Sequence, residues 1–159
     1  MVTSIPRALK FRRSDPAELI DSFASLQRAG EGWINLAPDL GDDQPPSRAG
    51  GWFSARGPEA PHATLMPGRV KRNGRVEPAQ LGIEHASGTK AARRLREAGM
   101  ELPAGALVRQ DHPKRGLVLQ VPADAPAEGL VIWLLDASVR LSRVPIGDGW
   151  RAEIWEPDR

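Results

Sequence analysis

The sequence predicts an α+β fold, a two-layer sandwich with a mostly antiparallel sheet of about five strands and three helices on one face. Two observations lead to this prediction. Two pairs of short apolar runs are each separated by a polar turn, as in β-hairpins, which build antiparallel sheets. Three longer segments carry apolar residues at helical spacing and need a sheet face to cover them.

The first helix is expected from about Pro16 to Arg28. Asp15 is a suitable N-cap, Pro16 fits the first helical position, and Glu18 would complete a capping box. The second is expected from about Thr89 to Ala98, with Ser87 or Thr89 as its cap.

The third helix, from about Pro126 to Leu141, has the strongest pattern, and Asp124 is its expected cap. Leu130, Leu134 and Leu135 recur at helical spacing. Ile132 and Trp133 widen the apolar face, so this helix is expected to pack on more than one side.

The clearest strands are Ala106–Gln110 and Gly116–Val121, joined by a polar turn. A second hairpin is predicted near the end, where Arg143–Ile146 and Trp150–Trp155 flank Gly147-Asp148-Gly149. Further strands are expected at the following positions: Trp33–Ala37, Thr64–Met66 and Leu81–His85.

The organisation expected is a basic N-terminal tail, residues 1–14, followed by one domain, residues 15–159, that includes a long flexible loop, 39–61. The length of 159 residues suits one domain. Trp52 and Phe53 follow Gly50-Gly51 in that loop, which favours a lid or a segment that docks on a partner, although packing on the domain's own core is equally typical.

Composition excludes several chemistries. There is no cysteine, which excludes disulfides, thiolate metal sites and cysteine nucleophiles. His62, His85 and His112 are the only histidines and are far apart, so we expect no metal site and no cofactor. We also expect no signal peptide and no membrane span, hence a cytoplasmic protein, and its arginine-rich composition is typical of a GC-rich bacterial genome.

The turn of the first hairpin holds the densest cluster of polar residues. It predicts a site for an anion, with His112 as a possible base, although solvated turns are usually polar without any function. The cluster comprises Arg109, Asp111, His112, Lys114 and Arg115.

A second candidate anion site lies where the strand ending at His85 leads into the second helix. Ser87, Thr89 and Lys90 precede or open this helix, whose free N–H groups could bind an anion, although ordinary capping explains the same residues. Glu84 and His85 could act as acid and base, but alternation along a strand sends neighbours to opposite faces.

These features favour a small binding or adaptor protein over an enzyme. The protein would act as a homodimer and present the hairpin turn and the aromatic loop to a protein or an anionic ligand. One alternative is an acid–base enzyme acting on an anionic small molecule, with His85 or His112 as base. The other is weak nucleic-acid binding through one patch made of the basic run Arg69–Arg75, the basic face of the second helix and the hairpin turn.

Overall fold

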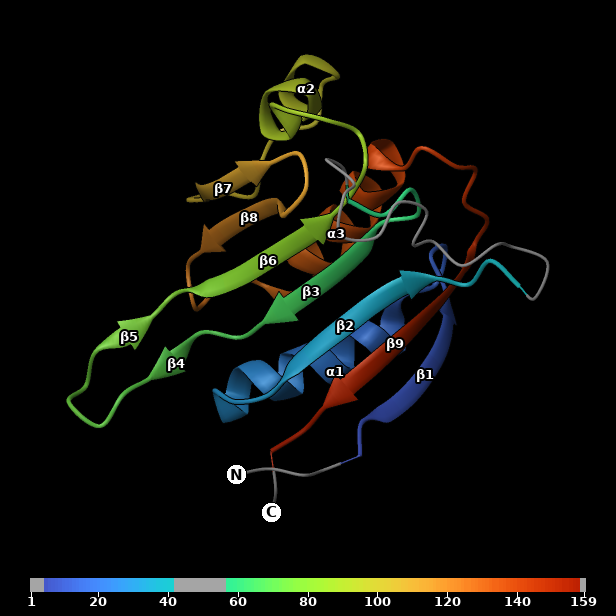
Figure 1. Ribbon diagram of the computed structural model, residues 1–159. Coiled ribbons are helices and arrows are strands. Elements are labelled where there is room, and N and C mark those ends of the chain that lie inside the picture. Colours follow the sequence, from blue (N-terminus) through green and yellow to red (C-terminus); the bar gives the residue numbers. More distant parts are fainter. Residues whose placement is uncertain (1–4, 42–56, 158–159) are drawn as a thin grey trace.

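The computed structural model describes residues 5–41 and 57–157, and it confirms the two-layer α+β sandwich. One layer is a seven-stranded sheet in which every neighbouring pair of strands is antiparallel. Helices α1 and α3 lie behind this sheet in Figure 1, and α2 packs beside α3 and the last strand of the sheet. No described helix covers the opposite side, which we call the open face.

The main sheet has two strands more than expected, and its order is β1-β9-β2-β3-β6-β8-β7. Its strands are β1 (Arg7–Arg12), β2 (Trp33–Pro38), β3 (His62–Met66), β6 (Ala79–Glu84), β7 (Leu107–His112), β8 (Gly116–Val121) and β9 (Gly149–Trp155). A separate two-stranded ribbon consists of β4 (Arg69–Val70) and β5 (Val76–Glu77).

Two parts of the predicted organisation are wrong. The segment expected to be a basic tail, residues 1–14, contains β1 at an edge of the sheet. The expected hairpin of Arg143–Ile146 with Trp150–Trp155 does not form. Instead β9 inserts between β1 and β2 and pairs with both, because these partners match the alternation of buried residues along β9.

The helices span α1 (Ala17–Ala29), α2 (Ala91–Glu97) and α3 (Ala127–Leu141), close to their predicted bounds. None has the expected side-chain cap: Pro16, Lys90 and Pro126 occupy the three N-cap positions. Gly30 ends α1 as predicted, since its left-handed backbone (φ 67°) lets its N–H donate to the Leu26 carbonyl.

The core lies between the helices and one side of the sheet. Ile154, Ile34, Leu65, Leu81 and Leu119 form one continuous cross-strand row, and all are almost fully buried. Burial of such a side chain contributes about 1.5–3 kcal/mol, so this row and the apolar side of α3 stabilise the sandwich.

Helix α3 packs on more than one side, as predicted. Leu130, Leu134 and Leu135 are buried, and the Trp133 indole N–H donates to the Glu101 carbonyl at 2.9 Å. Ile132 differs from the expectation, because it is 41% exposed.

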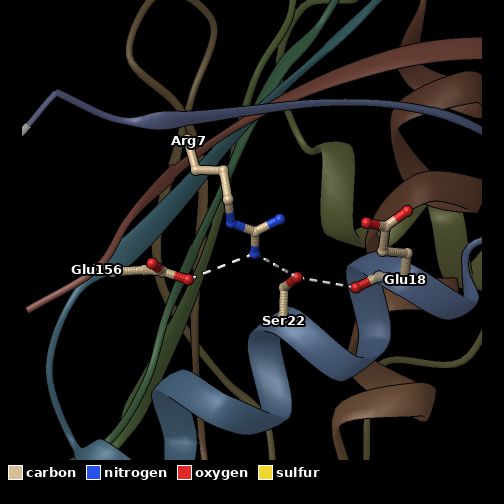
Figure 2. Close-up of polar contacts among 4 residues, drawn as sticks. All are labelled: Arg7, Glu18, Ser22 and Glu156. Carbon is tan, nitrogen blue, oxygen red and sulfur yellow. Dashed lines mark hydrogen bonds and ion pairs between the residues drawn. The ribbon is translucent and has the colours of Figure 1, made fainter.

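Strand β1 is held to the helical layer by a polar contact shown in Figure 2. The Arg7 guanidinium donates to Ser22 Oγ on α1 at 3.0 Å and to the Glu156 carboxylate at 3.4 Å. The Ser22 hydroxyl in turn donates to the Glu18 carbonyl at 2.9 Å. Since Ser22 is buried and the Arg7–Glu156 pair is half-exposed, the contact with Ser22 is the stronger anchor.

Residues 67–78 form a ribbon, here called the arm, that extends the β3–β6 hairpin beyond the main sheet (Figure 1). Pro67 and Pro78 stand at its two roots and interrupt the ladder, because proline has no backbone N–H to donate. Beyond them β4 and β5 pair again, with Val70 opposite Val76.

The helices found in residues 5–41 and 57–157 are too short or too polar to span a lipid bilayer.

Candidate functional site

The predicted hairpin forms from β7 and β8, but its polar residues do not converge. The Asp111 carboxylate turns toward α2, where its two oxygens accept the backbone N–H groups of Ala91 at 3.1 Å and Ala92 at 3.0 Å. Arg109 is exposed at a bulge in β7. The five residues therefore divide between the two sides of the sheet.

The second candidate anion site, at the start of α2, already has an acceptor from within the chain. Asp111 takes the two N–H groups that an external anion would bind. Lys90 adopts a left-handed backbone (φ 58°) at the N-cap, and the Thr89 carbonyl accepts a hydrogen bond from Arg94 Nε at 3.0 Å. Asp111 thus supplies the cap predicted for Ser87 or Thr89.

His85 is fully buried between the sheet and α2. Its Nδ1 accepts the Ser87 backbone N–H at 3.2 Å and lies 2.8 Å from Ser87 Oγ, which also accepts from Arg94 at 3.0 Å. Burial, and next the Arg94 cation, lower the pKa of His85 from its ordinary value. The imidazole is therefore neutral near pH 7, with Nδ1 as acceptor, and Nε2 has no partner among the described residues.

His112 has a similar local role. Its Nδ1 accepts the backbone N–H groups of Lys114 and Arg115, both at 3.1 Å, and so holds the turn between β7 and β8. Each of the two histidines expected to serve as a base thus uses a ring nitrogen to fix its own loop. Trp52 and Phe53, the residues expected to dock on a partner, lie outside the described residues.

The open face carries a hollow of about 190 Å³ where β3, β6 and β8 run side by side. Gly82 forms its floor, and a Cβ there would meet nothing closer than Thr64 Cβ at 4.0 Å. Around this floor stand three ionisable side chains: His62 of β3, Glu84 of β6, and Arg115 of the turn before β8. Thr64, Met66, Gln80 and Val118 are among the other residues that line it. We call this site the hollow.

Strand register brings two of these side chains together. His62 pairs directly with Glu84 across β3 and β6, so the partner of Glu84 on the open face is His62 and not its sequence neighbour His85. The alternation of side chains along a strand correctly predicts that Glu84 and His85 do not meet. That Glu84 meets His62 instead depends on the register between β3 and β6, which the sequence does not reveal.

Gly116 explains how Arg115 reaches the same place. Its backbone has φ of 90°, and a Cβ at this position would stand 2.2 Å from the Ile83 carbonyl oxygen. Only glycine allows β8 to approach β6 this closely. The hairpin turn is thereby held beside Glu84, and the Arg115 guanidinium lines the hollow.

Within the described part of the chain, the side chains of His62, Glu84 and Arg115 have no hydrogen-bond or ion-pair partner. A guanidinium can bind a carboxylate or phosphate through two parallel hydrogen bonds, and an imidazole can donate a further one. The Glu84 carboxylate can accept from a hydroxyl or ammonium group of the same ligand.

The described residues contain no group of three or more histidine or acidic side chains that could hold a metal ion. The chain matches no protein-family model, no curated protein and no solved structure. The candidate site therefore stands on its own geometry.

Proposed function

We propose that this chain is a binding protein that holds a small anionic ligand, a carboxylate or phosphate, in the hollow on the open face. One observation carries the proposal: three ionisable side chains that have no hydrogen-bond or ion-pair partner among residues 5–41 and 57–157 come from three neighbouring segments and surround a floor made of glycine. Arg115 would bind the anion, His62 would donate a further hydrogen bond, and Glu84 would select ligands that carry a donor group.

The size of the hollow limits the ligand. Its volume of about 190 Å³ is below the range of roughly 300–1,000 Å³ typical of sites for drug-sized molecules. Met66 and Val118 offer apolar contact at its edge. A ligand with one anionic group and a short apolar or hydroxylated body fits this combination best.

Acid–base catalysis by His85 or His112 is not part of the proposal, because Nδ1 of each ring already accepts backbone N–H groups. A protein partner for Trp52 and Phe53, a homodimer and a cytoplasmic location remain predictions.

The proposal is tested by NMR titration of the ¹⁵N-labelled chain with inorganic phosphate and, separately, with acetate. The amide of Gly82 and the imidazole of His62 should shift in a saturable manner. R115A should weaken the binding at least tenfold, because a charged hydrogen bond contributes about 1.5–3 kcal/mol. R96A, an equal loss of charge at an exposed position on α2, is the matched control.

A second variant, G82V, should fill the floor of the hollow and abolish the chemical-shift changes. Valine is favoured in β-strands, so this substitution should leave β6 folded. Shifts distributed away from the hollow, or equal affinities for R115A and R96A, would contradict the proposed function.

A further inference from the structure

We propose that the open face and the arm together form a binding surface for single-stranded nucleic acid. This inference rests on the proposed function, because it extends anion binding at the hollow to a ligand that carries many phosphates. It depends on three independent features of the same surface: its charge, the position of the arm, and a stacked pair of tryptophans of which Trp33 is exposed.

Charge is distributed unevenly over the molecule. The whole sequence has a formal net charge of only +2. On the open face and the arm, however, basic side chains clearly outnumber the acidic Glu77, Glu84 and Glu153. The basic residues are Lys10, Arg12, Arg69, Lys71, Arg72, Arg75, Arg115 and Arg151. A cationic surface on one side of a nearly neutral protein is complementary to a phosphate backbone.

The arm continues the open face. Arg69 and Arg75 border a hollow of about 300 Å³ together with Met66, Gln80 and Gln120, which lie on the open side of β3, β6 and β8. Val70 and Val76 pair with each other on the arm and border a second hollow next to the end of α1. Arg69 and Val76 border both hollows. The arginine-bearing side of the arm therefore adjoins the sheet surface without a break.

The tip of the arm is fully exposed. It carries Lys71, Arg72 and Arg75 around the turn at Asn73-Gly74, and only Lys71 is paired, with Glu77 at 2.8 Å. The side chains of Arg72 and Arg75 make no hydrogen bond or ion pair with the described residues, although Arg75 lies near enough to Glu77 to interact with its charge. Both guanidinium groups can therefore donate hydrogen bonds to phosphates.

Two tryptophans lie at the same end of the sheet. Trp33 and Trp155 pair across β2 and β9, and their rings stack with centroids 5.2 Å apart and planes 16° from parallel. Trp33 is 37% exposed on the open face. Because Ile34 pairs with Leu65, Trp33 stands level with Met66, where the chain leaves β3 for the arm.

One cross-strand row therefore combines Trp155, Trp33 and Met66 with two amides, Gln80 and Gln120. Exposed aromatic rings can stack on unpaired bases, and amides can hydrogen-bond to base edges, while neighbouring cations bind the phosphates. A duplex hides its bases from such a surface, which is why we infer a single strand.

The test is fluorescence anisotropy of the full chain with a labelled 20-nucleotide oligo(dT), its RNA counterpart oligo(U), and a duplex of equal length. Single strands should bind at least tenfold more tightly than the duplex. Raising salt from 50 to 200 mM should weaken the binding, with a log–log slope of about −2 to −3 if three or four phosphates are contacted. A flat salt response or equal binding of the duplex would overturn the inference.

Matched variants assign the contacts. R72A/R75A on the arm should lower the affinity at least tenfold and make the salt slope shallower, whereas R93A/R96A on α2 removes the same charge and should change neither. W33L should lower the affinity severalfold, and W33F, which keeps an aromatic ring, should restore most of it. Equal effects of the arm and α2 variants would overturn the inference.

The two proposals fail in different ways. If inorganic phosphate shifts Gly82 and His62 but no oligonucleotide binds, this inference is refuted and the proposed function stands. If neither ligand binds, both are refuted.

Discussion

Two aspartates depart from their expected roles, and this gives the sharpest test of the structure. Asp124 is predicted from sequence to cap α3 but makes no cap hydrogen bond, whereas Asp111, predicted to bind a ligand, holds the first turn of α2. D111A should leave two N–H groups without an acceptor, on the almost fully buried Ala91 and Ala92. A lost cap costs about 0.5–2 kcal/mol and a charged hydrogen bond about 1.5–3 kcal/mol. We therefore expect D111A to lower the free energy of unfolding by about 2–3 kcal/mol.

The measurement is chemical denaturation, supported by hydrogen exchange of the α2 amides. In a chain of this size the loss corresponds to a Tm about 5–10 °C lower. D124A removes the same side chain from an exposed position and should change the free energy of unfolding by less than about 0.5 kcal/mol. The reasoning is refuted if D111A unfolds as readily as the wild type, or if D124A proves the more damaging substitution.

Three further predictions concern stability. G116A should cost about 3 kcal/mol, measured by urea denaturation, because its Cβ would clash with the Ile83 carbonyl and its φ is 90°; a wild-type midpoint would contradict the close approach. The pKa of His85 is lowered in the folded chain, so below pH 6.5, the ordinary value for histidine, the unfolded chain binds more protons than the folded chain. The free energy of unfolding should therefore fall as the pH drops below 6.5, and H85Q should make this dependence weaker, as measured by urea denaturation at several pH values. An equally steep dependence in H85Q would contradict this reasoning. S22A removes the acceptor for Arg7 and should cost about 1 kcal/mol by thermal denaturation, and no loss would show that the contact contributes nothing.

Sequence predicts those elements whose pattern is local. Helix α3 is found to within about a residue because Leu130, Leu134 and Leu135 repeat with the period of a helix. The bounds predicted for strand β8 are correct, because a polar turn precedes its first residue and buried and less buried side chains alternate along it. Strand β1 is missed because its cationic residues surround one buried side chain, Leu9, and its only partner is β9, near the other end of the described chain.

The candidate site is less accessible to such reasoning. Closeness in sequence suggests that Asp111 and Arg115 act together, yet alternation along β7 sends the aspartate toward α2. The opposition of His62 and Glu84 depends on the register between strands 22 positions apart, for which no local pattern exists. Tertiary pairing thus decides which polar residues meet.

The place of β9 between β1 and β2 has a consequence for synthesis of the protein. Residues 7–12 and 33–38 are synthesised well before residues 149–155, the strand that joins them in the sheet. Until that moment β1 lacks the strand with which it pairs, and α1, which contacts both β1 and β2, packs on an incomplete sheet. This half of the molecule is therefore completed late in folding, in a step that depends on contacts between distant parts of the chain and is expected to be slow.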